Sequence, residues 1–306
     1  MIWNTTYHIT FKGTPALADS VLVVLEDVGK SLNVFDSGSL VSRVNGADSM
    51  TVDKHFINVY HASQKIHKAS DGMFDPTLSP LITAWGFGKG HKITADTASV
   101  DSIRQFVGLN KTSLQNDKLN KTDRRIQFNF SAVAKGYGCD QVAEMFKRNG
   151  VDDFMVEIGG EIAVGGNGPR KTGWRISIDK PIESDSISHE SGAIISLTDC
   201  GIATSGNYRN FHKEGGKTMG HTISPLTGRP VTSDVVSATV VAPTAMEADA
   251  AATACMATGA AKAAQILENL NYEGMLILAD SSVWMSDGFK KRLNAATSAP
   301  GRTNRN

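Results

Sequence analysis

An aspartate and a threonine stand four residues apart in the stretch EADAAATA, at Asp249 and Thr253. At that spacing both side chains lie on one face of a helix. A carboxylate and a hydroxyl, joined by a carbonyl oxygen from another segment, suit a hard cation such as Mg²⁺. The pair also fits a structural interpretation, in which the helix dipole favours an acid in the first turns. The spacing alone leaves both interpretations open.

Three other stretches hold residue types that bind or activate ligands. Lys135 opens the helix predicted after SAVA, where the dipole disfavours a positive charge; it indicates either an anionic ligand or plain solvent exposure. His221 precedes a turn rich in proline and glycine, where a histidine can take a proton from a nucleophile or serve as a polar turn residue. The glycines of VEIGGEIAVGGNGPR and TSGNYRNF allow a phosphate to approach the backbone, and equally suit tight turns.

The stretch DGMFDPT, residues 71–77, mixes residues of turns with residues of cores. A surface turn has no need of Met73 and Phe74, and a central strand does not accommodate Asp75 and Pro76. Apolar walls with a few placed polar groups are typical of a ligand pocket. The alternative is a turn that seals the core.

The elements that would position these residues follow from periodicity and end signals. Apolar residues recur at helical spacing after Thr14, which is predicted to cap that helix, with Pro15 as its first residue. Thr244 and Glu247 have the spacing of a capping box before an alanine-rich helix, which Gly259 should end. Further helices are predicted over about 53–70 and from SAVA to Asn149–Gly150, and strands over DFMVEI, GWRISID, GAIISL, VVSATVVA and GMLILAD.

Element order and composition indicate an α+β (mixed α/β) protein. Strands and helices follow one another without a regular βαβ pattern. No long linker or repeat interrupts the chain, so one domain is predicted over residues 1–290. A flexible C-terminal tail is predicted over 291–306, where periodicity ends. Acidic and basic residues balance at 31 each, which argues against a nucleic-acid partner.

Location is left open by the residues alone. No apolar run approaches the ~20 residues that span a bilayer, and no signal peptide is recognisable. The chain opens directly in a predicted strand, MIWNTTYHITF, as a trimmed mature form would.

Seven blocks, in order along nearly the whole chain, resemble those of the ApbE family of flavin transferases. SGSLVSRVN is similar to the family's S-x-x-S-x-[IL]-S-R-x-N, and DGMFDPTLSPLITAWGFG to D-G-x-F-D-[PI]-T-x-x-P-L-x-x-x-W-G-F-G. FNFSAVAKGYGCDQVA is similar to D-[LF]-[SG]-x-[IV]-A-K-G-[YF]-[AG]-x-D. The blocks VEIGGEI, TSGNY, HTISPLTGRPV and SATVVAPTAMEADAAATA follow in the family's order. The blocks over 71–88 and 131–140 are the most specific.

The resemblance implies an activity, a fold and a location. Such enzymes bind FAD with Mg²⁺ and transfer FMN to a threonine hydroxyl of an acceptor protein, releasing AMP. The acceptors are typically subunits of membrane redox complexes or flavin-carrying periplasmic proteins. The implied fold is ApbE-like, with mixed sheets flanked by helices and FAD in a cleft between two lobes. The implied location is the periplasm or the outer face of the inner membrane, with a lipid anchor in the full-length form.

Carried over position by position, the resemblance also implies a set of site residues. Asp249, Thr253 and the backbone carbonyl of Ala132 would hold the metal, with the Ala134 carbonyl as the alternative. His221 would be the catalytic base. The FAD contacts would come from Trp3, Phe35, Met73, Phe74, Asp75, Asn129, Lys135, Glu157, Gly159, Gly160 and Ile223.

Three positions depart from the family pattern. Trp3 replaces the methionine of the family's M-G-T, and an indole stacks on a ring as well as a methionine packs against one. Asn129 stands where an acid is common, so hydrogen bonding is kept and charge is lost. Ser224 replaces the aspartate of H-x-[IV]-D-P, which puts in question any role of that aspartate in orienting His221.

Two other activities are compatible with the same residues. Water in place of the acceptor hydroxyl would give an Mg²⁺-dependent FAD pyrophosphatase that produces FMN and AMP. A non-catalytic FAD-binding protein is the second alternative, and the retained Asp249 and Thr253 count against it.

Overall fold

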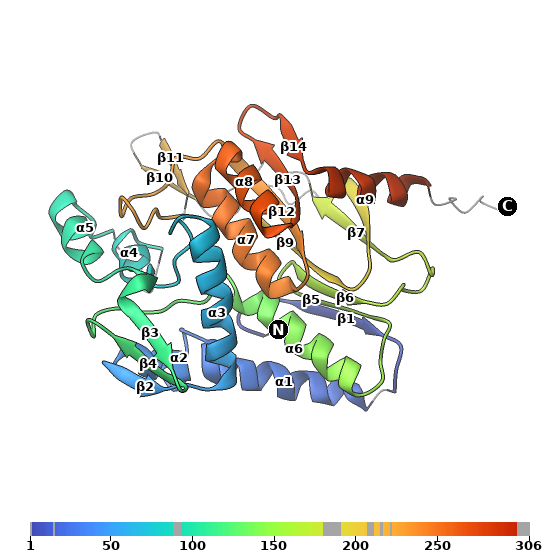
Figure 1. Ribbon diagram of the computed structural model, residues 1–306, viewed down its shortest axis with the longest axis horizontal. Helices are drawn as coiled ribbons and strands as arrows, with labels where there is room; N and C mark the ends of the chain where they lie inside the picture. Colours follow the sequence, from blue (N-terminus) through green and yellow to red (C-terminus); the bar gives the residue numbers. More distant parts are fainter. Residues whose placement is uncertain are drawn as a thin grey trace.

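A seven-stranded antiparallel sheet forms the centre of the computed structural model, which describes residues 2–14, 16–87, 93–179, 191–206, 211–214, 217–220 and 222–298. Its strand order is β1-β5-β6-β9-β12-β13-β14 (Figure 1). Its register aligns Tyr7 with Ile158 and Val240 with Ala203. The strands are β1 (Tyr7–Phe11), β5 (Phe154–Ile158), β6 (Glu161–Gly165), β9 (Cys200–Gly206), β12 (Val235–Ala242), β13 (Glu273–Leu278) and β14 (Val283–Met285).

Helices cover one face of this sheet. The helix α6 (Ala134–Arg148) packs on β5 and β6, and α7 (Ala245–Thr258) packs on β9 and β12. Outside them lie α1 (Leu17–Leu32), α3 (Lys54–Ala69) and α8 (Ala260–Leu270). The helix α7 is buried on nearly all sides, because its alanines leave room for close neighbours all round. The helix that carries Asp249 and Thr253 is therefore part of the core.

The opposite face of the sheet is covered by a hairpin and the last helix. The strands β7 (Trp174–Asp179) and β8 (Ser191–Leu197) pair antiparallel, and α9 (Asp287–Ser298) packs on β8 and β13. Phe289 is fully buried there with side chains of β6, β9 and β12. The first part of the expected tail over 291–306 is thus helical as far as Ser298, and residues 299–306 lie outside the described part of the chain.

A smaller lobe extends to the left of α3 in Figure 1. A three-stranded sheet of order β2-β4-β3 lies in this lobe near α2. Between β9 and β12 the chain forms a hairpin of β10 (Phe211–Glu214) and β11 (Lys217–Gly220). The elements of the lobe are α2 (Leu40–Asn45), β2 (Ser49–Thr51), α4 (Ser79–Ala84), α5 (Thr97–Arg104), a 3₁₀ turn over Leu109–Lys111, β3 (Thr112–Gln115) and β4 (Lys118–Lys121).

The α+β class is confirmed, and most predicted elements are present within a few residues of their expected bounds. Asp53 caps α3, and Thr244 caps α7 by accepting the Glu247 N–H, while Gly259 follows the end of α7. The first helix begins at Leu17, later than the Thr14 cap predicted. The Thr14 carbonyl accepts the Leu17 N–H in a turn that precedes the helix.

Candidate active site

Asp249 and Thr253 lie on α7 as the spacing predicted, with Asp249 buried at 3% exposure. The Oδ2 atom of Asp249 accepts the backbone N–H of Gly136 at 3.2 Å. The Thr253 hydroxyl lies 3.4 Å from the hydroxyl of Ser205, on β9. The first turn of α6, the middle of α7 and the end of β9 therefore meet in one region, where α7 and β9 supply the side-chain oxygen atoms.

Asp249 caps the N-terminus of the neighbouring helix. Gly136 is the third residue of α6, a position whose N–H has no partner within its own helix. Giving that N–H to a carboxylate places negative charge at the positive end of the helix. In a helix that began earlier, the Gly136 N–H would donate to the Ala132 carbonyl. Among the described residues no backbone N–H donates to that carbonyl.

The two helices cap each other. Asp140, one turn and a half into α6, accepts the N–H groups of Ala245 and Met246 at the start of α7, both at 2.8 Å. Burial raises the pKa of Asp140 to about 7, although these hydrogen bonds act in the opposite direction. Each helix thus supplies a carboxylate to the N-terminus of the other.

Two glycines permit this close crossing. A Cβ atom on Gly136 would lie 2.3 Å from the Ala245 carbonyl oxygen, and one on Gly201 of β9 would lie 2.1 Å from the Ala245 nitrogen. Such contacts are far shorter than packed atoms allow. The position of Asp249 relative to α6 therefore depends on glycine at both positions.

Lys135, the second residue of α6, forms an ion pair that the sequence analysis did not anticipate. Its Nζ lies 2.5 Å from Oε1 of Glu161, the first residue of β6. Burial raises the pKa values of Asp249 and Glu161, the charge of Asp249 raises that of Glu161 further, and Lys135 lowers both. Burial opposes the charge of Lys135, but Asp249 and Glu161 outweigh this effect and raise its pKa. Two buried carboxylates thus share one lysine beside the oxygen atoms of α7.

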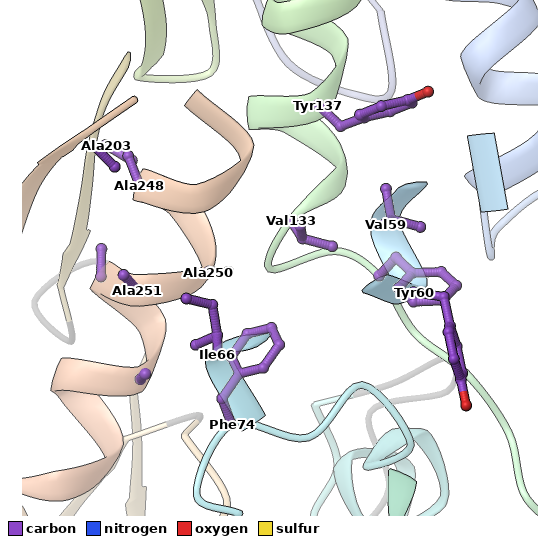
Figure 2. Packing of buried hydrophobic residues seen from close by; sticks show 14 of the residues in the cluster. Val59, Tyr60, Ile66, Phe74, Val133, Tyr137, Ala203, Ala248, Ala250 and Ala251 are labelled. Atoms are coloured by element: carbon purple, nitrogen blue, oxygen red, sulfur yellow. The ribbon is translucent and has the colours of Figure 1, made fainter. Parts of the chain in front are cut away.

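The DGMFDPT stretch splits between core and loop roles. Phe74 is buried in the main core, where Figure 2 shows it beside Ile66 of α3 and near α7. Asp75 is buried and accepts the N–H and hydroxyl of Thr77 with Oδ1 and the N–H of Leu109 with Oδ2. Its oxygens thus hold the loop itself, and its contact with FAD stays a prediction. Half-buried Met73 accepts a long hydrogen bond from Ser224 at 3.9 Å.

Asn129 lies beside this stretch. Its backbone N–H donates to the Pro76 carbonyl at 2.7 Å, and its side-chain oxygen accepts the Ser131 N–H. Asn45 at the end of α2 binds both backbone groups of Phe128, at 2.7 and 2.9 Å. FNFSAVAKG thus contacts SGSLVSRVN through Asn45 and DGMFDPT through Pro76.

The loop after His221 is fastened to the smaller lobe, while His221 itself lies outside the described residues. Ile223 is buried against Leu81 and Val100. The indole N–H of Trp85 donates to the Gly228 carbonyl at 2.7 Å. Ser224 accepts the Thr227 N–H, so this serine caps the turn as an aspartate could. The turn geometry therefore does not need the aspartate of the family pattern.

Trp3, Phe35 and Glu157 lie in three further places. The Trp3 indole packs between α1 and α6, where a Cβ on Gly29 or Gly138 would lie 2.8 or 2.7 Å from it. Phe35 is 59% exposed in the loop between α1 and α2. Glu157 binds His8 and the Gly160 N–H, both at 2.6 Å, and so closes the turn between β5 and β6. The flavin contacts assigned to these three residues stay predictions.

The structure thus brings Lys135, Asp249 and Thr253 to the α6–α7 crossing, and a backbone hydrogen bond joins the loops of Asp75 and Asn129. It adds Glu161, Ser205 and Asn45, which the sequence analysis did not single out. A groove of about 560 Å³ lies elsewhere, between α3, α6 and the start of α7, and none of its lining residues belongs to the predicted site. Its Lys65 and Glu247 are already paired with each other.

Comparisons with known proteins give the same family. The ApbE family model matches residues 3–276. The FAD:protein FMN transferase of Haemophilus influenzae is 31% identical over 94% of this chain and 88% of that protein. The protein of the same name from Vibrio cholerae is 31% identical over 94% of this chain and 87% of its own length.

Solved structures agree. The flavin transferase ApbE from Vibrio cholerae superimposes with a TM-score of 0.85 at 29% identity, covering 96% of this chain and 97% of that one. The apo form of the Pseudomonas stutzeri flavinyl transferase ApbE gives 0.83 at 25% identity, with 95% and 97% covered. The fold is that of the ApbE flavin transferases. This chain belongs to the ApbE family.

Proposed function

We propose that this protein transfers FMN from FAD to a threonine hydroxyl of an acceptor protein and releases AMP, with Mg²⁺ at the α6–α7 crossing. The observation that supports it best is the oxygen-rich cluster around buried Asp249, in a chain that matches FAD:protein FMN transferases over nearly its whole length. Family membership makes the activity expected, and the cluster offers the chemistry that it needs.

The residues present fit a magnesium ion. Among the described residues no group of three or more His, Cys, Asp or Glu side chains converges, so a transition-metal site is not favoured there. Asp249 and Thr253 offer a carboxylate and a hydroxyl, and the Ala132 carbonyl lacks a backbone partner within the described chain. Oxygen ligands of this kind suit Mg²⁺. These features favour the Ala132 carbonyl over that of Ala134, which lies inside α6.

When bound, the ion would neutralise pyrophosphate charge and stabilise the leaving group. The acceptor oxygen would form a bond to the FMN-side phosphorus while the bond to the AMP oxygen breaks. The hydroxyl proton would pass to a base, for which we propose His221. Lys135, whose ammonium is kept charged by two carboxylates, would contact the phosphates. The protein thus contributes mainly positioning and electrostatics.

The test is mass spectrometry of an acceptor that carries a threonine flavinylation motif, after incubation with the protein, FAD and Mg²⁺. We expect the acceptor to gain the mass of FMN, and an acceptor of unchanged mass would contradict the transferase proposal. AMP release without acceptor would instead support the FAD pyrophosphatase alternative. FAD that stays intact with and without acceptor would support the non-catalytic alternative.

The Asp249→Asn variant tests the metal site. Removing the charge while keeping the side-chain volume should lower Mg²⁺-dependent transfer at least about 100-fold. The matched control is Asp19→Asn, which removes an exposed carboxylate from α1 and should leave transfer unchanged. Full activity of Asp249→Asn would rule out this metal site. His221→Ala should slow transfer and leave FAD affinity nearly unchanged, and a loss confined to affinity would make His221 a binding residue.

The partner and location proposed here rest on the resemblance. A subunit of a membrane redox complex is the proposed acceptor, and the periplasm or outer face of the inner membrane the proposed place, with a lipid anchor in the full-length form. No helix among the described residues is long and apolar enough to cross a bilayer. Fractionation of cells expressing the full-length protein tests the location, and recovery in the cytosol would contradict it.

A further inference from the structure

The turn between β5 and β6 holds the stem of Lys135. Gly159 has a φ of +64°, and a Cβ there would lie 3.2 Å from Lys135 Cδ and 2.9 Å from the Thr5 hydroxyl. The lysine stem therefore runs across the one face of the turn that a side chain at Gly159 would occupy. Glycine at this position gives both the left-handed backbone and the space.

Glu161, at the other end of this turn, holds the head of the same lysine. Its Oε1 lies 2.5 Å from Lys135 Nζ, and Glu161 is only 4% exposed. Lys135 also interacts electrostatically with Asp249, yet no ion pair within 4.0 Å joins these two among the described residues. The Lys135 ammonium is therefore paired with Glu161 and not with Asp249.

The pairing of Lys135 with Glu161 matters because Asp249 is the carboxylate proposed to bind Mg²⁺. A buried carboxylate without a paired positive charge is costly, so it attracts the nearest positive charge. If Glu161 did not hold Lys135, the ammonium would be free to move toward Asp249 and occupy the oxygens that a cation needs. The Oε2 atom of Glu161 is buried and has no hydrogen-bond partner in the described structure, so the ion pair of Oε1 with Lys135 is what offsets the burial of this carboxylate.

We propose that Glu161 is a positioning residue that draws the Lys135 ammonium away from Asp249 and so keeps the Asp249 carboxylate open to a divalent cation. The proposal rests on the metal site of the proposed function. Glu161 acts through Lys135 and need not touch the cation. In the same way Gly159 acts through the stem of Lys135, and its own contact with FAD stays a prediction.

The experiment measures Mn²⁺ affinity of the purified flavin-free protein by electron paramagnetic resonance of the free ion. Mn²⁺ accepts the same oxygen ligands as Mg²⁺. The variants are Glu161→Gln, Glu161→Asp, Lys135→Gln and the double variant Glu161→Gln/Lys135→Gln. The matched control is Glu144→Gln, on the exposed face of α6, and thermal melts show that each variant is folded.

We expect Glu161→Gln to weaken Mn²⁺ binding about tenfold, and the double variant to return to within about threefold of wild type, since coupling of this size is usual between contacting charges. Glu161→Asp keeps the charge but is shorter by one methylene, so it should also bind weakly. Glu144→Gln should bind as wild type does.

Three results would overturn the proposal. Unchanged affinity in Glu161→Gln would show that Lys135 does not compete for Asp249. A double variant as weak as Glu161→Gln would make Glu161 a direct ligand. Wild-type affinity in Glu161→Asp would mean that net charge alone matters. A wild-type protein that binds no Mn²⁺ would instead remove the metal site itself, which is the failure of the proposed function.

Discussion

At the scale of single residues, buried charges fix the loops around the site. Lys121, at the end of β4, is 9% exposed, and its ammonium donates to the carbonyls of Val44, Asn45, Arg124 and Ile126 at 2.9 to 3.3 Å. Burial lowers its pKa. This lysine joins the end of α2 to the chain that leads into the site, so its energetic role is structural.

Lys121→Met is expected to destabilise the protein by about 2–4 kcal/mol, because several buried carbonyls lose their donor at once. Urea unfolding measures the free energy. The control is Lys118→Met, an exposed lysine on the same strand, which should change stability by less than about 0.5 kcal/mol. Equal effects of the two substitutions would show that the four hydrogen bonds contribute little.

Asp140 predicts a pH dependence of stability. Its pKa is about 7 in the folded protein and about 3.9 in an unfolded chain. Between these values the folded state holds a proton that the unfolded state has lost, so stability falls as pH rises from about 4 to 7. We expect about 1–2 kcal/mol from this group between pH 5 and 8, less than the full shift implies, because the side chain is only half-buried.

Asp140→Asn should remove that contribution. Urea unfolding gives the free energy of unfolding of wild type and variant at pH 5 and at pH 8. The contribution of Asp140 is the change, between these two pH values, in the difference between the two proteins. The asparagine variant should be less stable relative to wild type at pH 5 than it is at pH 8. Glu144→Gln, also on α6, serves as control. A difference between wild type and Asp140→Asn that is the same at both pH values would refute the prediction.

At the scale of elements, the crossing of α6 and α7 over β9 determines the site. Gly136→Ala would put a methyl 2.3 Å from the Ala245 carbonyl oxygen, so the helices must separate. We expect a loss of about 3 kcal/mol in stability, at the upper end of usual overpacking costs, and weaker Mg²⁺ binding. The measurements are urea unfolding and calorimetric titration.

The control for this prediction is Gly46→Ala, after α2. Gly46 has an ordinary negative φ, and a Cβ there would meet its nearest atom at 3.6 Å. That variant should be within about 0.5 kcal/mol of wild type. If Gly136→Ala were as mild as Gly46→Ala, the close crossing would not be what places Asp249.

The helices and strands were largely predictable from sequence, but the contacts between residues far apart in the chain were not. Thr244 and Gly259 are local signals, and they bound α7 correctly. Glu161 follows two glycines and carries no local sign that its partner is Lys135, 26 positions earlier (161 − 135). Asp75 and Trp3 show the converse. Their types suited ligand contacts, and only the tertiary structure reveals that loop hydrogen bonds hold Asp75 and that interhelical packing holds Trp3. Their contacts with FAD stay predictions.

At the scale of the whole molecule, the sheet separates two cores. The site lies on the helical face, whereas Phe289 of α9 lies in the cluster on the opposite face, with Trp174 and Ile195. Successive side chains of β12 point to opposite faces of the sheet. Val240 therefore packs in the core on the helical face and Val241 in the core on the opposite face.

Phe289→Leu should therefore lower stability and spare the site. A smaller side chain at a fully buried position is expected to cost about 1–2 kcal/mol. Thermal unfolding should shift downward, while FAD affinity at a temperature where the variant is folded should stay within about twofold of wild type. A marked loss of FAD affinity in folded protein would show that the two cores are coupled.

The mutual capping of α6 and α7 has a consequence for how the chain becomes active during synthesis. The carboxylate that completes the start of α6 lies 113 residues further along the chain. While a ribosome extends the chain, α6 must wait with an open N-terminus until α7 has emerged. Asp140 likewise has no partner until the N–H groups of Ala245 and Met246, which donate to it, have been made. A nascent chain that ends before α7 therefore contains neither finished helix, and the candidate site forms only when the last fifth of the protein, which begins at Ala245, has been made.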